Sequence, residues 1–236
     1  RYTLYCNTWC SPNHWRMRSV IEVYDPSAPE TLSFNSASDP VLEDIITRQV
    51  DIDAPHPAET IPPESPSAVQ GAGIVAELGR KLPADLTRPT WRRSHTPVEA
   101  WKELVRVGLD ENQAWDAVAF LWLADLGPQQ RQEAGELYAK NCAACHGETG
   151  DGRGPGASVL AEQHSEHTGT MAMEAAPTAF ADPEVMLGGT GEIYYAKLRR
   201  GGMGTSMPSF GQILTPEETW QLVDYLWTFV FDPERR

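Results

Sequence analysis

The chain has 236 residues, of which 41% are hydrophobic, so it can bury one large core or two small ones, and we favour two units. Acidic residues outnumber basic ones by 33 to 19, which gives a formal net charge of −14. Nucleic acid is therefore a poor candidate partner, because phosphates attract basic surfaces, whereas a basic or neutral protein suits this charge. No stretch approaches the roughly 18 to 20 apolar residues of a membrane span. We expect no transmembrane segment, and membrane association only through partner proteins or through an anchor that the numbered chain does not show.

Residues 1–95 are rich in proline and poor in hydrophobic periodicity. Proline fixes φ and removes a backbone donor, so this stretch predicts extended segments and turns, with short helices at 39–49 and 68–82. A loop-like segment of this length rarely stands alone. We interpret it as an interaction arm that packs on a partner or wraps over the rest of the chain, with disorder as the alternative.

Residues 96–128 predict a pair of helices. Thr96-Pro97-Val98-Glu99 supplies an N-cap, a proline at the first helical position and an acid in the first turn, which predicts a helix to about Val107. A second helix is predicted over 112–126, because apolar residues recur there at three- and four-residue steps. These residues are Trp115, Val118, Ala119, Trp122 and Leu126.

Residues 129–236 predict further helices around an irregular middle. A helix over 129–141 leads directly into Cys142, and the stretch 147–191 contains enough glycine and proline to be largely irregular. A helix over 192–200 precedes a methionine-containing loop at 201–211. Thr215-Pro216-Glu217-Glu218 repeats the capping pattern and begins a final helix that runs to about residue 231. The apolar face of this last helix consists of Trp220, Val223, Leu226, Trp227 and Val230.

Cys142-Ala143-Ala144-Cys145-His146 has the form C-x-x-C-H. In this pattern the two thiols form thioethers with the vinyl groups of a haem, and the adjacent imidazole binds the iron on one face. A dithiol of the thioredoxin type also uses C-x-x-C, but it follows a strand and needs no histidine beside it. A zinc site requires a second cysteine or histidine pair, and none lies at a suitable spacing. The motif therefore predicts one covalently attached haem c.

Two stretches resemble a known family. The run from Gly135 to Gly147 resembles the opening of a class I cytochrome c domain, and the run 202–210 with the capped helix after it is similar to that family's distal-ligand loop and C-terminal helix. The resemblance covers 129 to about 231 and implies an all-α cytochrome c fold, with three or more main helices around one haem. It also implies that Met207, just before a proline, is the sixth iron ligand. A last implication is that Gly135 and Tyr138 pack against Tyr225.

The distal ligand has alternatives in the sequence. Met203 lies four residues before Met207 in the same glycine-rich loop and is its main competitor. The other candidates, which we interpret as apolar cover or as solvated loop residues, are Met171, Met173, His164 and His167. His/Met ligation raises the reduction potential and leaves no open position on the iron, so it favours electron transfer, whereas a second histidine would lower the potential.

Two further segments of this region carry weaker signals. The stretch 177–183 resembles the segment that in many relatives crosses the haem edge and offers backbone groups to the proximal histidine or to a propionate. Lys197, Arg199 and Arg200 place three cations just before the distal loop, where they would pair with haem propionates or dock an acidic partner. A solvated basic helix end, which suits the helix dipole, is the equal alternative.

Cys6 and Cys10 form C-x-x-x-C followed by Ser11, so the histidine that would bind a second haem is missing from its place. A local disulfide is the favoured interpretation, because haem attachment of this type occurs outside the cytoplasm, where thiols oxidise. A lipidated Cys6 is the alternative.

Residues 101–126 resemble a faint copy of the second half of a cytochrome c domain, without a C-x-x-C-H motif or a Met-Pro loop. Two interpretations stay open for this stretch. It is a degenerate, haem-free copy, or it is a pair of amphipathic helices that pack on the true domain.

These inferences divide the chain into an irregular arm (1–95), a helical pair (96–128) and a monohaem cytochrome c domain (129–236). We expect electron transport through one haem c in a periplasmic or other extracytoplasmic, membrane-associated setting, as a subunit of a respiratory or photosynthetic membrane complex. The monohaem cytochrome subunit of the quinol-oxidising alternative complex III is one candidate. The alternatives are a haem-based sensor or enzyme with a labile distal ligand, and the electron-accepting subunit of a dehydrogenase. The sequence shows no catalytic constellation besides the haem motif, so catalysis would belong to a partner.

Overall fold

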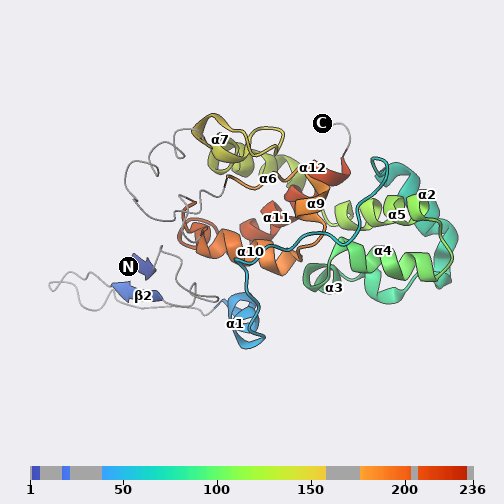
Figure 1. Ribbon diagram of the computed structural model, residues 1–236, viewed down its shortest axis with the longest axis horizontal. Helices are drawn as coiled ribbons and strands as arrows, with labels where there is room; N and C mark the ends of the chain where they lie inside the picture. The colour runs from blue at the N-terminus through green and yellow to red at the C-terminus, as the bar shows by residue number, and fades with distance from the viewer. Residues whose placement is uncertain (1, 6–17, 22–38, 158–175, 203–206, 233–236) are drawn as a thin grey trace.

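The structure is a computed structural model that describes residues 2–5, 18–21, 39–157, 176–202 and 207–232 (Figure 1). Within these ranges the fold is all-α apart from two short strands, β1 (Tyr2–Tyr5) and β2 (Arg18–Ile21), which pair antiparallel. The α-helices are α1 (Pro40–Thr47), α2 (Ala68–Leu78), α3 (Pro89–Ser94), α4 (Pro97–Arg106), α5 (Glu111–Leu123), α6 (Pro128–Asn141), α7 (Ala143–His146), α9 (Pro183–Met186), α10 (Gly191–Arg200), α11 (Pro216–Leu226) and α12 (Thr228–Phe231). Short 3-10 helices are η3 (Gly79–Lys81), η4 (Ala84–Thr87) and η5 (Phe210–Gln212).

Local sequence signals explain where several of these helices begin. Thr96, Asp110 and Thr215 each cap a helix, and the side chain three residues later closes a capping box in α4, α5 and α11. Proline stands in the first turn of α4, α6 and α11, where its missing N–H is not needed. The helices expected over 96–107, 112–126, 129–141 and 192–200 are confirmed to within a few residues. The last one differs, because it is divided at Trp227 into α11 and α12.

Helices α6 and α11 cross where a glycine lets them approach closely. A Cβ atom on Gly135 would lie 3.0 Å from the Tyr225 hydroxyl, so only glycine fits this crossing without a shift. The Tyr138 ring lies 5.6 Å from the Tyr225 ring and 4.9 Å from the Phe229 ring, measured between centroids. The expected packing of Gly135 and Tyr138 against Tyr225 is thereby confirmed.

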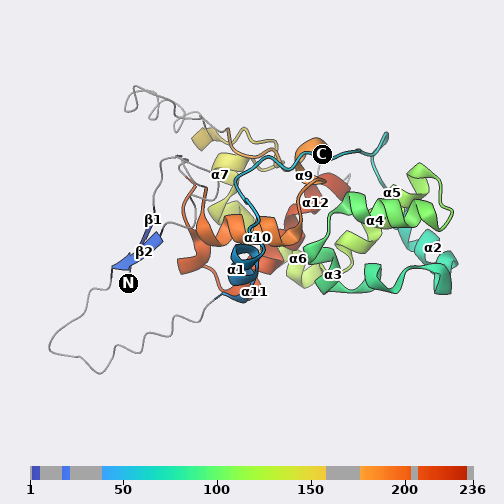
Figure 2. The same cartoon turned by 60° about the horizontal axis from the view of Figure 1, so that its bottom comes forward.

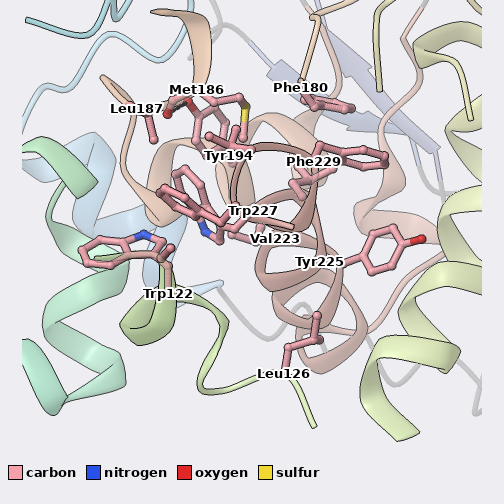
Figure 3. Packing of buried hydrophobic residues seen from close by; sticks show 14 of the residues in the cluster. Trp122, Leu126, Phe180, Met186, Leu187, Tyr194, Val223, Tyr225, Trp227 and Phe229 are labelled. Atoms are coloured by element: carbon pink, nitrogen blue, oxygen red, sulfur yellow. Dashed lines mark hydrogen bonds between the residues drawn. The ribbon is translucent and has the colours of Figure 1, made fainter. Parts of the chain in front are cut away.

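One apolar core joins these C-terminal helices to the helices before them. Trp122 of α5 meets Trp227 edge to face at 6.4 Å, and Trp227 meets Tyr194 of α10 at 5.5 Å. Figure 3 shows Trp122 pointing from its own helix toward Trp227 and Val223. Helices α2, α4 and α5 lie together on one side of the molecule, apart from α6, α7, α10 and α11 (Figures 1 and 2).

Helix α1 lies against α10 instead of projecting away from the chain (Figure 2). Leu42, Ile45 and Ile52 form a small buried cluster with Ala196 of α10. Further on, the Ala58 amide donates to the carbonyl of Glu184 in α9 at 2.9 Å. Of the two settings expected for the N-terminal arm, the described residues adopt the one in which it wraps over the rest of the chain.

The first 95 residues contain more helix than the sequence pattern predicts. Helices α1 and α2 occupy the two expected positions, but η4 and α3 were not expected. No side chain caps the start of α3. It is fixed by Arg92, which is buried, donates to the Leu86 carbonyl at 2.8 Å and pairs with Asp125. These partners lie on other elements, so the local pattern carries no trace of them.

Candidate functional site

Cys142, Cys145 and His146 share one helical turn that follows directly on α6. The amides of Cys145 and His146 both donate to the Cys142 carbonyl, at 3.1 and 2.9 Å, and the Cys142 amide donates to the Tyr138 carbonyl at 2.8 Å. Both cysteines are free thiols. Burial raises the pKa of the Cys142 thiol to about 12, and the nearby Cys145 acts in the same direction. The Cys142 sulfur is therefore protonated at neutral pH, and both thiols are available for attachment of a covalent group.

The His146 imidazole is buried and oriented by two neighbours. Its Nδ1 lies 3.0 Å from the carbonyl oxygen of Thr178, and its ring stacks on Phe180 with centroids 4.5 Å apart and an interplanar angle of 19°. A carbonyl only accepts, so Nδ1 carries the proton and donates. Burial lowers the pKa of His146, opposed by this hydrogen bond. The neutral ring thus keeps the lone pair of Nε2 for a metal, which is the arrangement that ligating histidines adopt.

The turn after His146 depends on glycines. Gly152 has φ +75°, a left-handed conformation, and its amide donates to the His146 carbonyl at 2.9 Å. A Cβ atom at Gly152 would lie 2.5 Å from the Pro177 carbonyl oxygen. At Gly154, a Cβ atom would lie 2.3 Å from the Ala144 carbonyl oxygen. Glycine therefore lets the segment with Thr178 and Phe180 lie directly against the C-x-x-C-H turn.

An aromatic cluster supports the far side of that segment. The Phe180 ring lies 6.3 Å from Tyr138 and 6.1 Å from Phe229, and Figure 3 shows Phe180 and Phe229 side by side. The Tyr138 hydroxyl donates to the Gly147 carbonyl at 2.7 Å in a buried position. Helix α6, the C-x-x-C-H turn and α12 are therefore tied to one cluster, which fixes the direction of the His146 ring. The resemblance of 177–183 implied that this segment offers backbone groups to the proximal histidine or to a propionate, but it gave no indication of the Phe180 stack.

Met207 lies beyond the C-terminal end of α10. It is partly buried and packs on the same apolar cluster that contains Cys142 and Phe180. Its carbonyl accepts from the Gly202 amide at 3.1 Å, which holds the two ends of the intervening stretch together. Gly201 adopts φ +88° where the chain leaves α10. Met207 thus remains the prediction for the distal ligand.

Several residues singled out in the sequence lie outside the described residues. They are Met203, the main alternative to Met207, together with Cys6, Cys10, His164, His167, Met171 and Met173. The expectations for them stay predictions.

The cations at the end of α10 have partners within the chain. The guanidinium of Arg199 pairs with Asp39 at 3.0 Å, and both side chains are nearly buried. Arg200 binds Asp53 through two hydrogen bonds, one of 2.8 Å from Nη1 to Oδ2. Burial lowers the pKa of Lys197, and Asp53 opposes this. Acidic residues of the N-terminal arm thus occupy both arginines, a use that the sequence did not indicate.

Comparison with known families identifies this part of the chain. Residues 132–229 match the family model described as Cytochrome c. The chain contains a c-type cytochrome domain. The matched residues include the C-x-x-C-H turn, the Phe180 segment and the loop with Met207, so every described part of the site lies inside the cytochrome domain.

Comparison with solved structures and with curated proteins adds no further family assignment. A solved structure of a reducing HAO-like protein complex from Kuenenia stuttgartiensis matches with 16% identity and a TM-score of 0.36, over 71% of this chain and 98% of the chain compared. A TM-score this low establishes no shared fold. A search of the curated proteins found no match.

The donor set of the cytochrome domain fits a covalent haem. Two unbridged thiols and a neutral histidine stand on one turn, in the order that thioether formation and axial ligation require. A bound haem would supply reversible one-electron chemistry at its iron. The protein would contribute the attachment points, the orientation of the axial ligand and a buried setting.

Proposed function

We propose that the chain transfers single electrons through one haem c, attached at Cys142 and Cys145, with His146 as the proximal and Met207 as the distal iron ligand. The observation that carries this proposal is the hydrogen bond from His146 Nδ1 to the Thr178 carbonyl. It fixes the tautomer and the ring orientation that iron ligation at Nε2 needs. A His/Met pair leaves no open position on the iron, which suits a relay and not oxygen chemistry.

The number of haems follows from the sequence motif. C-x-x-C-H occurs once in the 236 residues, and Cys6 and Cys10 lack a following histidine. One haem per chain is therefore the expected stoichiometry. Met207 is favoured over Met203 because the proline after it is the one feature of the loop that the class I resemblance assigns to the ligand position.

The chain is proposed to act as a subunit of an extracytoplasmic, membrane-associated electron-transfer complex, of which the alternative complex III is one example. Covalent haem attachment outside the cytoplasm supports the location. The long N-terminal extension supports the role of a subunit, since a freely diffusing carrier needs little beyond its haem domain. In the described part of the chain, every helix is too short or too polar to cross a membrane.

The test is an absorption spectrum of the purified, haem-loaded chain in both oxidation states. We expect one haem per chain, a ferric sulfur-to-iron charge-transfer band, and no reaction of the reduced form with carbon monoxide. Ready binding of carbon monoxide would contradict His/Met electron transfer and would favour a sensor or an enzyme with a labile distal ligand.

Variants assign the distal ligand. Met207→Leu should abolish the charge-transfer band and open the iron to carbon monoxide, whereas Met203→Leu should leave both properties unchanged. Met186→Leu is the matched control, because Met186 is a fully buried core methionine with no proposed role at the iron. Loss of the band in Met203→Leu alone would move the distal assignment to that residue.

A further inference from the structure

Asp39 makes two separate sets of contacts at the start of α1. Its Oδ1 caps the helix by accepting from the Val41 and Leu42 amides at 3.1 and 3.4 Å. Its Oδ2 faces α10, where it accepts from the Tyr195 hydroxyl at 2.8 Å and from Arg199 Nε at 3.0 Å. The side chains of Arg199 and Asp39 are only 13% and 11% exposed, so solvent screens this pair little. Asp39 therefore holds the Arg199 guanidinium in one place.

Arg199 in turn contacts two residues of the stretch that follows Met207. Its Nη1 donates to the Leu214 carbonyl at 2.5 Å, and its own carbonyl accepts from the Ser209 hydroxyl at 2.7 Å. The chain returns so closely that a Cβ atom on Gly211 would lie 2.6 Å from the Arg199 carbonyl oxygen. The end of α10 and the stretch 209–214 are thus tied together through one residue, with Met207 between them.

Other contacts make the arm a firm support for Asp39. Leu42 and Ile45 bury against Ala196, and Arg48 at the end of α1 pairs with Glu192 at the start of α10. The arm is therefore attached at both ends of α1, and its carboxylate at residue 39 has little freedom to leave Arg199.

We propose that Asp39 is a positioning residue for the distal ligand: it fixes Arg199, which holds the stretch 209–214, shortly after Met207, against the end of α10. This inference rests on the proposed function, because it needs Met207 to bind the iron. The N-terminal arm then has a task inside the chain. It stabilises the closed, methionine-ligated state of the haem site from outside the cytochrome domain.

Asp39→Asn separates the two contacts of this residue. Its amide oxygen can still cap α1, but its NH2 group would meet Arg199 Nε, a donor facing a donor. Asp110→Asn is the matched control, because Asp110 also caps a helix and accepts from the Gln113 amide at 2.9 Å, but forms no ion pair within the part of the chain that the structure describes. Both variants change the charge equally.

The readouts are the ferric charge-transfer band, the pH at which it disappears, and the rate at which the reduced protein binds carbon monoxide. For Asp39→Asn we expect the charge-transfer band to disappear at lower pH than in the wild type. We also expect carbon monoxide to bind faster by on the order of tenfold, because this factor corresponds to the loss of one hydrogen bond to a charged group. Asp110→Asn should match the wild type. Arg199→Lys, which keeps the positive charge but lacks the donor to Leu214, should behave like Asp39→Asn.

The failure of this inference differs from the failure of the proposed function. A wild-type band that Asp39→Asn and Arg199→Lys both leave unchanged would overturn the role of Asp39 alone. A wild-type protein without the band would overturn His/Met ligation itself, and the positioning role with it.

A second, independent observation concerns the helices before the cytochrome domain. A Cβ atom on Gly71 of α2 would lie 1.9 Å from the Asp116 carbonyl oxygen and 2.9 Å from Phe120 Cβ, so α2 crosses α5 through a glycine as α6 crosses α11. Phe120 faces Gly71 and stands ten residues after Asp110, the N-cap of α5. Tyr225 faces Gly135 and also stands ten residues after its N-cap, residue 215 at the start of α11.

A stacked aromatic pair repeats as well. Trp101 stacks on Trp115 at 5.7 Å and 22°, and Tyr195 stacks on Trp220 at 4.5 Å and 26°. All four aromatic residues stand five residues after the N-cap of their own helix. The helices are α4 for Trp101, α10 for Tyr195, α5 for Trp115 and α11 for Trp220. Three helices thus repeat one arrangement: α2, α4 and α5 match α6, α10 and α11.

The haem ligands do not repeat. When Gly71 is placed on Gly135, the positions that correspond to Cys142, Cys145 and His146 are held by Leu78, Lys81 and Leu82. We infer that residues 67–126 form a haem-free copy of the cytochrome scaffold, which packs on the cytochrome domain through the shared apolar core and carries no electrons itself.

Hydrogen exchange distinguishes a copy that stays folded without haem from helices that are ordered only by their contact with the cytochrome domain. The comparison uses the full haem-loaded chain and the haem-free variant Cys142→Ala/Cys145→Ala. We expect the amides of α2 and α5 to keep their slow exchange in both proteins, while those of α6 and α11 exchange at least tenfold faster without haem. Equal loss of protection in α2, α5, α6 and α11 would overturn the inference.

Discussion

Gly71→Ala is the most demanding test of the packing between α2 and α5. The new Cβ atom would lie 1.9 Å from the Asp116 carbonyl oxygen and 2.5 Å from its carbon. Contacts below 3.0 Å are essentially never seen for real Cβ atoms, and here the opposing atoms are backbone, which cannot rotate away. Helix α2 would therefore have to move by more than 1 Å from α5.

The magnitude follows from two opposing effects. Overpacking a close contact costs roughly 1 to 3 kcal/mol, and a clash with backbone belongs at the upper end. Replacing a glycine inside a helix by alanine stabilises it by about 1 kcal/mol. Gly73→Ala lies in the same helix with nothing within 4 Å of its Cβ position, so it shows the second effect alone. The free energies of unfolding of the two variants should differ by about 3 kcal/mol, with Gly71→Ala the less stable.

Urea unfolding followed by tryptophan fluorescence measures this difference, because Trp115 and Trp122 lie in α5 and Trp101 in α4 stacks on Trp115. Gly73→Ala should unfold at higher urea than the wild type and Gly71→Ala at clearly lower urea. A difference below about 1 kcal/mol would refute the close crossing of α2 and α5, and with it the argument that this crossing repeats that of α6 and α11.

Three further predictions concern the haem site and helix α11. Gly152→Ala would place a Cβ atom 2.5 Å from the Pro177 carbonyl oxygen, at a backbone φ of +75°. We therefore expect the His146 hydrogen bond to weaken and the reduction potential of the haem-loaded protein to change. An unchanged potential would contradict this role of Gly152. Phe180→Ala should cost roughly 3 to 5 kcal/mol in urea unfolding, because it empties a buried site beside the histidine ring; a cost below about 1 kcal/mol would speak against that stack. Burial raises the pKa of Asp224 to about 7, so between about pH 4 and 7 the folded state holds a proton that the unfolded state releases. The free energy of unfolding should therefore fall by up to about 4 kcal/mol as the pH rises through this range. Asp224→Asn should remove most of this slope in unfolding measured across that range, and an unchanged slope would assign it to other groups.

The sequence predicts the cytochrome domain well because its signals are local. Capping boxes and prolines mark where α4, α6 and α11 begin, and the C-x-x-C-H motif places three functional groups on one turn regardless of the rest of the fold. The crossing of Gly135 with Tyr225 was expected only through the family resemblance. Spacing alone does not bring residues 90 positions apart into contact.

The features that the sequence did not predict depend on distant partners. Asp39 and Arg199 are 160 residues apart and Asp53 and Arg200 are 147 apart, so no window of sequence contains both members of either pair. The same reason explains α3, whose buried Arg92 is held from other elements. From the sequence alone, the basic end of α10 is expected to contact solvent, a haem propionate or an acidic partner protein. Its actual neighbours are acidic residues of an arm whose sequence predicts mostly irregular structure.

These internal pairs change what the charge of the chain implies about partners. The net charge of −14 includes cations that face the chain's own carboxylates: the Arg199 side chain is 13% exposed and the Arg200 side chain 5% exposed. They are therefore poorly placed to dock an acidic protein beside the distal loop, which was one of the roles that the sequence left open. Because exposed charges within about a Debye length dominate the steering of encounters, the excess of carboxylates on the surface should favour a basic or neutral redox partner. Association with a basic partner should slow as ionic strength rises, and a rate independent of salt would place recognition on apolar contact instead.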